Sequence, residues 1–315
     1  MQIVITDGYT LNPGDLSWEP FEKFGDLKYY DRTPVSDVTE RCKEATVIIT
    51  NKTPITSQTI NSAPGLKLIS VSATGYNIVD INAAKENGIF VCNVPEYGTD
   101  SVAQHTFALL LELTNKVGRH AQSVKDGDWV RSADWSYVKE PIVELSGKTI
   151  GIVGFGRIGR KVAEIAKAFG MNVIIHNKNK QTPGATSMAL HELFSQSDVV
   201  SLHCPLNEEN TGFVNSLLLS MMKPTAFLIN TSRGLLINEH DLSDALQRNV
   251  LAAAALDVLS QEPPLGSNPL VGLQNCIITP HNAWISYEAR KRLMLTTFEN
   301  IEAVMCGKPV NVVNP

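Results

Sequence analysis

Cysteine is scarce in this sequence of 315 residues, and its five thiols are far apart. No two of them form a Cys-x-x-Cys pair; they are Cys42, Cys92, Cys204, Cys276 and Cys306. Disulfide frameworks and thiolate metal clusters need closer or paired cysteines. We therefore expect reduced thiols, no bound metal and a cytoplasmic location.

Long apolar runs and an excess of positive charge are also missing. Residues 107–111 and 251–256 are far shorter than the roughly 18–20 residues of a membrane helix, and the start MQIVITDG has no signal-peptide pattern. The 27 Lys and Arg against 32 Asp and Glu give a net charge of −5. That balance argues against nucleic-acid binding and against a polybasic membrane surface. The length predicts about two globular domains.

What the sequence does contain is a repeated alternation of short apolar runs and amphipathic stretches. This rhythm predicts parallel sheets with helices on their faces. The predicted strands are 3–6, 46–50, 66–71, 149–153, 173–176, 199–203, 226–230, 251–256 and 277–279. The predicted helices are 35–45, 79–87, 101–117, 157–169 and 285–306.

Residues 101–141 interrupt this alternation. The helix predicted at 101–117 is apolar nearly all round between Phe107 and Leu111, so it must be buried on more than one side, at a domain junction or a subunit interface. Residues 127–141 are rich in Trp, Ser and charge and have no period. They predict an extended arm or loop, and loops of that length are usually functional.

A glycine pattern directly follows the strand predicted at 149–153. Gly154-x-Gly156-x-x-Gly159 precedes a helix and then a second strand. The first glycine allows a tight turn, the second lets the backbone approach a pyrophosphate, and the third lets helix and strand pack closely. Free N–H groups at the helix start can receive the anion. The pattern predicts a dinucleotide-binding site.

The end of the second strand departs from that fingerprint. A carboxylate is expected there to hold the ribose 2′-hydroxyl, but Asn177 occupies the position, followed by Lys178 and Lys180. Without the carboxylate a 2′-phosphate is not repelled, and the ammonium groups could attract it. NAD and NADP both stay open, with NADP slightly favoured.

Three later segments place chemically useful side chains at predicted strand ends, where doubly wound folds have their sites. Arg233 follows one strand, and an arginine can hold a carboxylate with two parallel hydrogen bonds. His281 follows another and could move a proton near neutral pH, with Glu262 as its partner. Taken singly, each residue is more often structural than catalytic, and spacing alone does not bring them together.

In this order, after the glycine pattern, the segments resemble the D-isomer-specific 2-hydroxyacid dehydrogenase family over nearly the whole chain. The resemblance is strongest to its glycerate dehydrogenase, or hydroxypyruvate reductase, branch. The residues that carry it are Thr50–Thr53, Ala73–Asn77, Tyr97–Thr106 and Thr279–Trp284.

The resemblance implies a role for each candidate residue. His281 is the acid–base residue, Glu262 its partner and Arg233 the substrate anchor. The residues implied in substrate binding are Lys52, Thr74, Gly75, Tyr76, Arg233 and Trp284. Those implied in cofactor binding are Gly154, Gly156, Arg157, Ile158, Gly159, Asn177, Lys178, His203, Cys204, Pro205, Thr231 and Asp257.

The resemblance also implies a fold and an activity. It predicts an α/β protein with two doubly wound, Rossmann-like domains and a cleft between them: a discontinuous substrate domain at 1–98 and 286–315, and an NAD(P)-binding domain at 99–285. Such a protein reduces a 2-oxo acid (hydroxypyruvate, and glyoxylate) to the D-2-hydroxy acid by hydride transfer, and we expect a homodimer. The alternatives are a D-lactate or phosphoglycerate dehydrogenase, or a nucleotide-sensing corepressor that binds protein partners.

Overall fold

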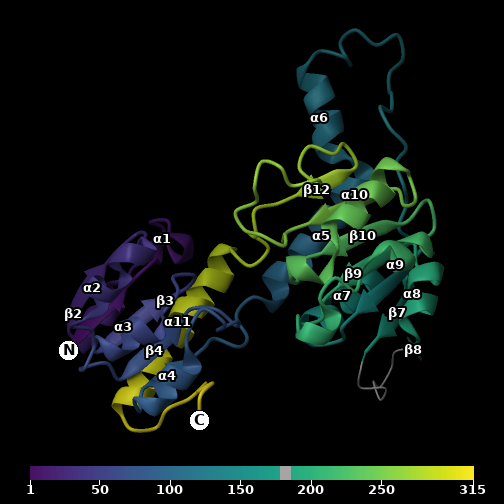
Figure 1. The fold of residues 1–315 in the computed structure, drawn as a ribbon. Coiled ribbons are helices and arrows are strands. Elements are labelled where there is room, and N and C mark those ends of the chain that lie inside the picture. Colours follow the sequence, from purple (N-terminus) through teal and green to yellow (C-terminus); the bar gives the residue numbers. More distant parts are fainter. Residues whose placement is uncertain (178–185) are drawn as a thin grey trace. The chain divides into compact units, whose positions relative to one another are not determined.

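The chain leaves one folded unit after Gly98 and returns to it at Ile285. The first unit contains Met1–Gly98 and Ile285–Pro315, and the second contains Thr99–Trp284. The computed structural model describes residues 1–177 and 186–315 (Figure 1). The predicted cofactor residue Lys178 lies outside the described residues.

The first unit is built on a five-stranded parallel sheet in the order β2-β1-β3-β4-β5. Apolar residues of α2, α3 and α4 pack on one face of this sheet, while α11, from the far end of the chain, packs against β4. The strands are β1 (Gln2–Ile5), β2 (Asp26–Tyr29), β3 (Val47–Thr50), β4 (Leu68–Val71) and β5 (Phe90–Cys92). The helices are α1 (Gly8–Leu11), α2 (Val38–Cys42), α3 (Ser57–Asn61), α4 (Ile81–Glu86) and α11 (Tyr287–Met305).

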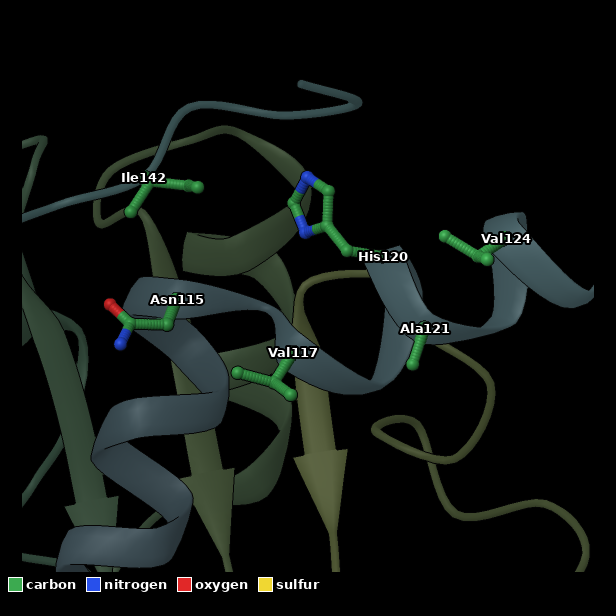
Figure 2. Close-up of a pocket in the computed structure, with 6 residues that line it drawn as sticks. All are labelled: Asn115, Val117, His120, Ala121, Val124 and Ile142. Atoms are coloured by element: carbon green, nitrogen blue, oxygen red, sulfur yellow. The ribbon is translucent and has the colours of Figure 1, made fainter. Parts of the chain in front are cut away.

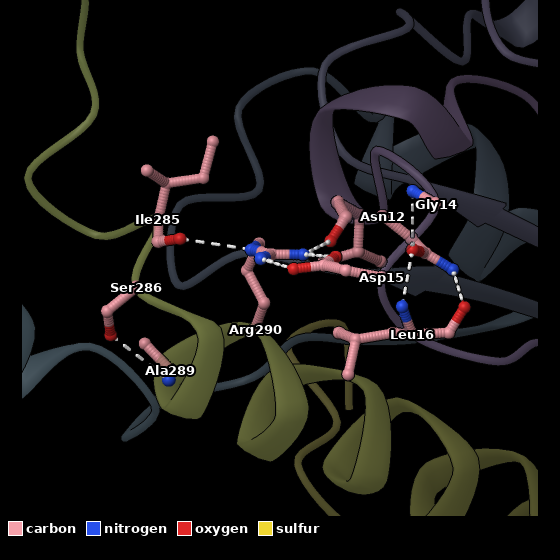
Figure 3. A network of polar contacts seen from close by, with 9 residues as sticks. Asn12, Gly14, Asp15, Leu16, Ile285, Ser286, Ala289 and Arg290 are labelled. Atoms are coloured by element: carbon pink, nitrogen blue, oxygen red, sulfur yellow. Dashed lines mark hydrogen bonds and ion pairs between the residues drawn. The ribbon is translucent and has the colours of Figure 1, made fainter.

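An ion pair between a buried arginine and an exposed aspartate holds the start of α11 in place. Arg290 is only 5% exposed and donates to both carboxylate oxygens of Asp15, each at 2.6 Å (Figure 3). Its Nε also donates to the carbonyl of Ile285 at 3.0 Å. The guanidinium hydrogen bond holds the pKa of Asp15 below its ordinary value. The point where the chain re-enters the first unit is thereby tied to the loop that follows α1.

The second unit is built on a seven-stranded parallel sheet in the order β12-β11-β10-β9-β6-β7-β8. Its two apolar cores lie on opposite faces, one under α8, α9 and α10 and the other under α5 and α7. The strands are β6 (Thr149–Val153), β7 (Asn172–His176), β8 (Thr186–Ser187), β9 (Val199–Leu202), β10 (Phe227–Asn230), β11 (Ala253–Leu256) and β12 (Cys276–Ile278). The helices are α5 (Thr99–Asn115), α6 (Val117–Lys125), α7 (Arg157–Ala168), α8 (Leu190–Gln196), α9 (Ser216–Ser220) and α10 (Glu239–Gln247). Strand order reverses between β6 and β9, where such sheets bind their ligands.

The strands predicted from apolar runs are confirmed to within about two residues. The prediction missed β2, β5 and β8. β2 is an edge strand whose four residues, DLKY, are exposed or half-buried, so it has no apolar run to reveal it. The helix predicted at 101–117 ends at Asn115, because Lys116 takes a left-handed φ of 52° and α6 starts afresh after it.

Within the described part of the chain, no helix combines the length and the apolar character that crossing a bilayer requires. The same residues contain no group of three or more His, Cys, Asp or Glu side chains placed to hold a metal ion.

Candidate functional site

Three adjacent strands of the second unit end beside the predicted catalytic residues. β10, β11 and β12 are parallel neighbours, so their carboxyl ends share one edge of the sheet. Arg233 lies three residues after β10, Glu262 in the loop after β11, and His281 three residues after β12.

His281 and Glu262 form a close pair. His281 Nδ1 lies 2.5 Å from Glu262 Oε2, and the second carboxylate oxygen of Glu262 accepts from the backbone N–H of Leu259 at 3.0 Å. The His281 side chain is 26% exposed. Because Nδ1 faces the carboxylate, Nε2 is the ring nitrogen turned away from Glu262.

The loop that carries His281 is held by a buried carboxylate. Asp257, 2% exposed, accepts from the Thr279 hydroxyl at 2.6 Å and from the backbone N–H groups of Asn282 and Ala283 at 3.0 and 2.9 Å. The backbone N–H of His281 itself donates to the Asp257 carbonyl at 2.9 Å. His281 has φ of 52°, a conformation that persists at a non-glycine residue only where its surroundings enforce it.

Arg233 lies on a turn shaped by the buried side chain of Asn230. The Asn230 amide donates to the Arg233 carbonyl at 2.9 Å and accepts from the Ser232 N–H at 3.0 Å. The next residue, Gly234, packs so closely that a Cβ there would lie 1.9 Å from the carbonyl carbon of Leu259. The glycine thus lets the turn of Arg233 contact the segment that leads to Glu262.

The glycine turn after β6 has the shape expected of an anion site. Gly154 has φ of 92°, and a Cβ there would lie 2.5 Å from the backbone nitrogen of Cys204. A Cβ on Gly159 would lie 2.2 Å from the Gly154 carbonyl oxygen, so helix and strand pack closely here. A Cβ on Gly156 would meet nothing within 4 Å, and none of the described side chains caps the start of α7. Open space before the backbone N–H groups at the start of a helix fits a pyrophosphate.

The other predicted cofactor residues lie around the same strand ends. His203, Cys204 and Pro205 follow β9, Asn177 follows β7, and Arg157 and Ile158 open α7. His203 Nε2 is 2.8 Å from the Ser201 hydroxyl, and burial lowers the pKa of His203 to about 4. That imidazole is therefore neutral at physiological pH. Thr231, after β10, is buried, and its hydroxyl lies 3.1 Å from that of Thr106.

The predicted substrate residues, apart from Arg233 and Trp284, belong to the first unit. Lys52 follows β3, and Thr74, Gly75 and Tyr76 follow β4. Lys52 and Thr74 are exposed, and Tyr76 is 37% exposed. Trp284 ends the second unit and is only 9% exposed. In the first unit these residues thus follow the neighbouring strands β3 and β4, whereas in the second unit Arg233 and Trp284 follow β10 and β12, which β11 separates.

Sequence reasoning missed Asp7, which builds the loop of Lys52. Its carboxylate accepts from the backbone N–H groups of Asn51, Lys52 and Thr53 at 2.8, 2.5 and 2.8 Å, and Asp7 is 8% exposed. An acidic residue directly after a buried strand and before Gly8 was the available signal. It pointed to a strand end but not to its partner 44 residues away.

This combination of strand ends and glycine turn is found in a known protein family. The family model of the NAD binding domain of D-isomer specific 2-hydroxyacid dehydrogenases matches residues 107–283. The chain belongs to this family. The matched residues contain the glycine turn and all three predicted catalytic residues.

Individual relatives match most or all of the chain. A hydroxypyruvate reductase of Blautia hydrogenotrophica is 48% identical over the full length of both proteins. A glycerate dehydrogenase of Methylorubrum extorquens is 38% identical over 91% of this chain and 92% of its own length. The solved structure of an acyclic imino acid reductase in complex with NADPH and D-Arg has a TM-score of 0.86 at 36% identity, covering 99% of this chain and 100% of that one.

These matches confirm the predicted fold class of two parallel-sheet α/β domains and a nicotinamide-dependent oxidoreductase of this family. The turn at Gly154–Gly159 fits the phosphates of such a cofactor, since Gly156 leaves open space before the backbone N–H groups at the start of α7.

Proposed function

We propose that this dehydrogenase reduces hydroxypyruvate, and also glyoxylate, giving D-glycerate from hydroxypyruvate. The observation that carries the proposal is the His281–Glu262 pair, 2.5 Å apart, on the same sheet edge as Arg233. The 48% identity to a hydroxypyruvate reductase favours this substrate over the other 2-oxo acids of the family.

In the proposed reaction Arg233 stabilises charge, and His281 transfers a proton with the help of Glu262. Arg233 holds the 2-oxo acid and stabilises the negative charge that develops on its carbonyl oxygen. Protonated His281 gives its Nε2 proton to that oxygen, while Glu262 steadies the imidazolium through Nδ1. A bound nicotinamide supplies the hydride at C2. In the oxidative direction His281 accepts the hydroxyl proton instead.

We assign substrate binding to the first unit and NAD(P) binding to the second. Backbone N–H groups around Thr74, Gly75 and Tyr76 would bind the substrate carboxylate, with Lys52 and Trp284 nearby. The glycine turn, Arg157 and Ile158 would hold the pyrophosphate, and His203, Cys204 and Pro205 the adenosine side, while Thr231 and Asp257 would lie beside the nicotinamide.

NADP(H) is the slightly favoured nicotinamide. Asn177 stands where a carboxylate would repel a 2′-phosphate, and Lys178 supplies positive charge next to it in the sequence. NAD(H) binding through hydrogen bonds from Asn177 is the competing possibility.

The arm that follows α5 supports a homodimer as the proposed assembly. The apolar face of α5 is used within its own unit, packed on α7 and the sheet. Beyond it, a groove on α6 is lined largely by apolar residues, among them Val117, Val124 and Ile142 (Figure 2). Val130 and Trp135 are 89% and 87% exposed. Exposed apolar side chains and an apolar groove on the same arm favour contact with a second copy.

The test is turnover of a panel of 2-oxo acids with NADH and NADPH. We expect hydroxypyruvate to give the highest kcat/KM, followed by glyoxylate. His281→Ala is expected to lower kcat by about 10²–10⁴-fold while cofactor affinity is retained, because general acid–base help is lost. His191→Ala, at an exposed histidine of α8, serves as the matched control.

Other outcomes identify the competing functions. A preference for pyruvate or for a phosphorylated 2-oxo acid indicates a D-lactate or phosphoglycerate dehydrogenase. Tight cofactor binding with negligible turnover of every acid indicates a nucleotide-sensing binding protein. Undiminished turnover by His281→Ala contradicts the assignment of His281.

A further inference from the structure

Three polar side chains on the first half of α5 reach the segments that follow β10 and β12. The Ser101 hydroxyl donates to the Ala283 carbonyl at 2.7 Å, and His105 Nε2 lies 3.1 Å from the Thr279 hydroxyl. Ser101 and His105 are four residues apart, so they share one face of the helix. The same helix places Thr106 against Thr231. Neither Ser101 nor His105 is among the predicted catalytic, substrate-binding or cofactor-binding residues.

The direction of the hydrogen bonds at Thr279 follows from its single proton. The Thr279 hydroxyl lies 2.6 Å from Asp257 Oδ1, and a carboxylate accepts hydrogen bonds without donating them. The hydroxyl proton is therefore directed at Asp257, and only the lone pairs of the oxygen remain for His105. His105 Nε2 must carry a proton and donate it. This gives a directed chain from His105 through Thr279 to Asp257, and His105 Nε2 also lies 3.5 Å from the same carboxylate oxygen, Asp257 Oδ1.

We propose that His105 is a positioning residue for His281. The chain from His105 fixes Thr279 and the carboxylate of Asp257, and that carboxylate in turn accepts from the backbone N–H groups of Asn282 and Ala283, the two residues that follow His281. The proposal rests on the proposed function, since it concerns the reaction in which His281 moves the proton.

The conformation of His281 explains why such a support is needed. Its φ of 52° is unfavourable for a residue with a side chain, so the loop relaxes when its fastenings are removed. Relaxation moves the imidazole away from Glu262, to which Nδ1 is now 2.5 Å distant. Catalytic groups must be held to within about 0.5 Å of their productive geometry. Loss of one remote hydrogen bond therefore affects turnover more than substrate binding.

The experiment compares His105→Leu with His105→Gln. Leucine removes the donor, and we expect kcat for hydroxypyruvate reduction to fall by about 10- to 100-fold, with KM and the Kd for NADPH little changed, because a small misplacement of a catalytic group costs rate. Glutamine can present an amide N–H near the position of Nε2, so it is expected to restore most of kcat. His191→Leu on α8 is the matched control and should behave as wild type.

Thr279→Val supplies a second measurement that tests the same chain. It keeps the shape of the side chain and removes the hydroxyl, so it should reproduce the loss of kcat seen in His105→Leu. Because both substitutions interrupt one chain, the double variant His105→Leu/Thr279→Val should lose no more than the worse single variant. Circular dichroism shows whether each variant is folded. The kcat values of the single and double variants are compared only for variants that are folded.

The results separate this proposal from the function on which it rests. An unchanged kcat in His105→Leu, a His105→Gln variant no better than the leucine, or additive losses in the double variant overturn the positioning role. If His281→Ala also retains turnover, the proposed function fails as well. If His281→Ala is inactive while His105→Leu is normal, only the positioning role is lost.

Discussion

In each unit of this protein, a buried aspartate that follows one strand holds the loop that follows a neighbouring strand of the same sheet. In the first unit Asp7, after β1, receives the N–H groups of Asn51–Thr53, after β3. In the second unit Asp257, after β11, receives those of Asn282 and Ala283, after β12. Both carboxylates are under a tenth exposed.

The two arrangements differ in what else reaches the carboxylate from outside the loop. Asp257 also takes the Thr279 hydroxyl, with His105 of α5 behind it, and its loop contains a left-handed histidine. Asp7 has three consecutive N–H groups of one loop, with the neighbouring Thr6 hydroxyl at 3.1 Å. The loop proposed for proton transfer therefore has more side-chain support than the loop proposed for substrate binding.

Of the changes that test this comparison, Asp257→Asn should have the largest effect, and the effect should be on kcat. Its amide nitrogen would face hydrogen-bond donors that now meet an oxygen, so the loop of His281 shifts. We expect kcat to fall by roughly 100-fold or more, with a smaller change in NADPH affinity. Steady-state kinetics and cofactor titration measure both, with Asp244→Asn, exposed on α10, as the control. A variant that loses cofactor affinity but keeps kcat would contradict the role of Asp257 in holding His281.

Asp7→Asn should show a different pattern. Its amide nitrogen would face the N–H groups of residues 51–53, which destabilises the first unit by about 1–3 kcal/mol. If this loop binds substrate through Lys52, KM for hydroxypyruvate rises more than kcat falls. Urea unfolding and steady-state kinetics measure the two effects, and Asp26→Asn, exposed on β2, is the control. A fall in kcat at constant KM would refute a substrate-binding role for this loop.

Lowering the pH to mildly acidic values should have the smallest effect. It should lower the stability of the protein through His203, a residue of the second unit. The pKa of His203 is lowered by burial from 6.5 to about 4, so between these pH values the unfolded chain takes up a proton that the folded chain does not. Stability attributable to His203 therefore falls as the pH drops from 6.5 towards 4. In the first unit the pKa of Asp15 is lowered from the ordinary value of 3.8, so stability attributable to Asp15 is lost only at pH values below about 3.8.

Urea unfolding at pH 7 and pH 5 tests this difference. Wild type should lose stability between the two, His203→Gln should lose less, and Asp15→Asn should show the wild-type loss. Equal losses in wild type and His203→Gln would show that His203 is not responsible.

Much of the second unit could be predicted from the sequence because its signals are local. Buried parallel strands appear as apolar runs, and the glycine turn combines a strand, three glycines and a helix within a few residues. β2 gave no such signal, since an edge strand can be polar. α6 was not predicted either, because α5 is interrupted only by the left-handed Lys116.

The sequence by itself determined the parallel α/β class, the dinucleotide turn and, through family resemblance, Arg233, Glu262 and His281 as candidates. Only the tertiary structure decided how these residues are held. Asp7 lies 44 residues from its partner loop and His105 lies 174 residues from Thr279. Hydrogen bonds over such separations depend on which strands are neighbours and which helix packs on their ends. Strand order and helix packing are properties of the folded chain, and no local pattern encodes them.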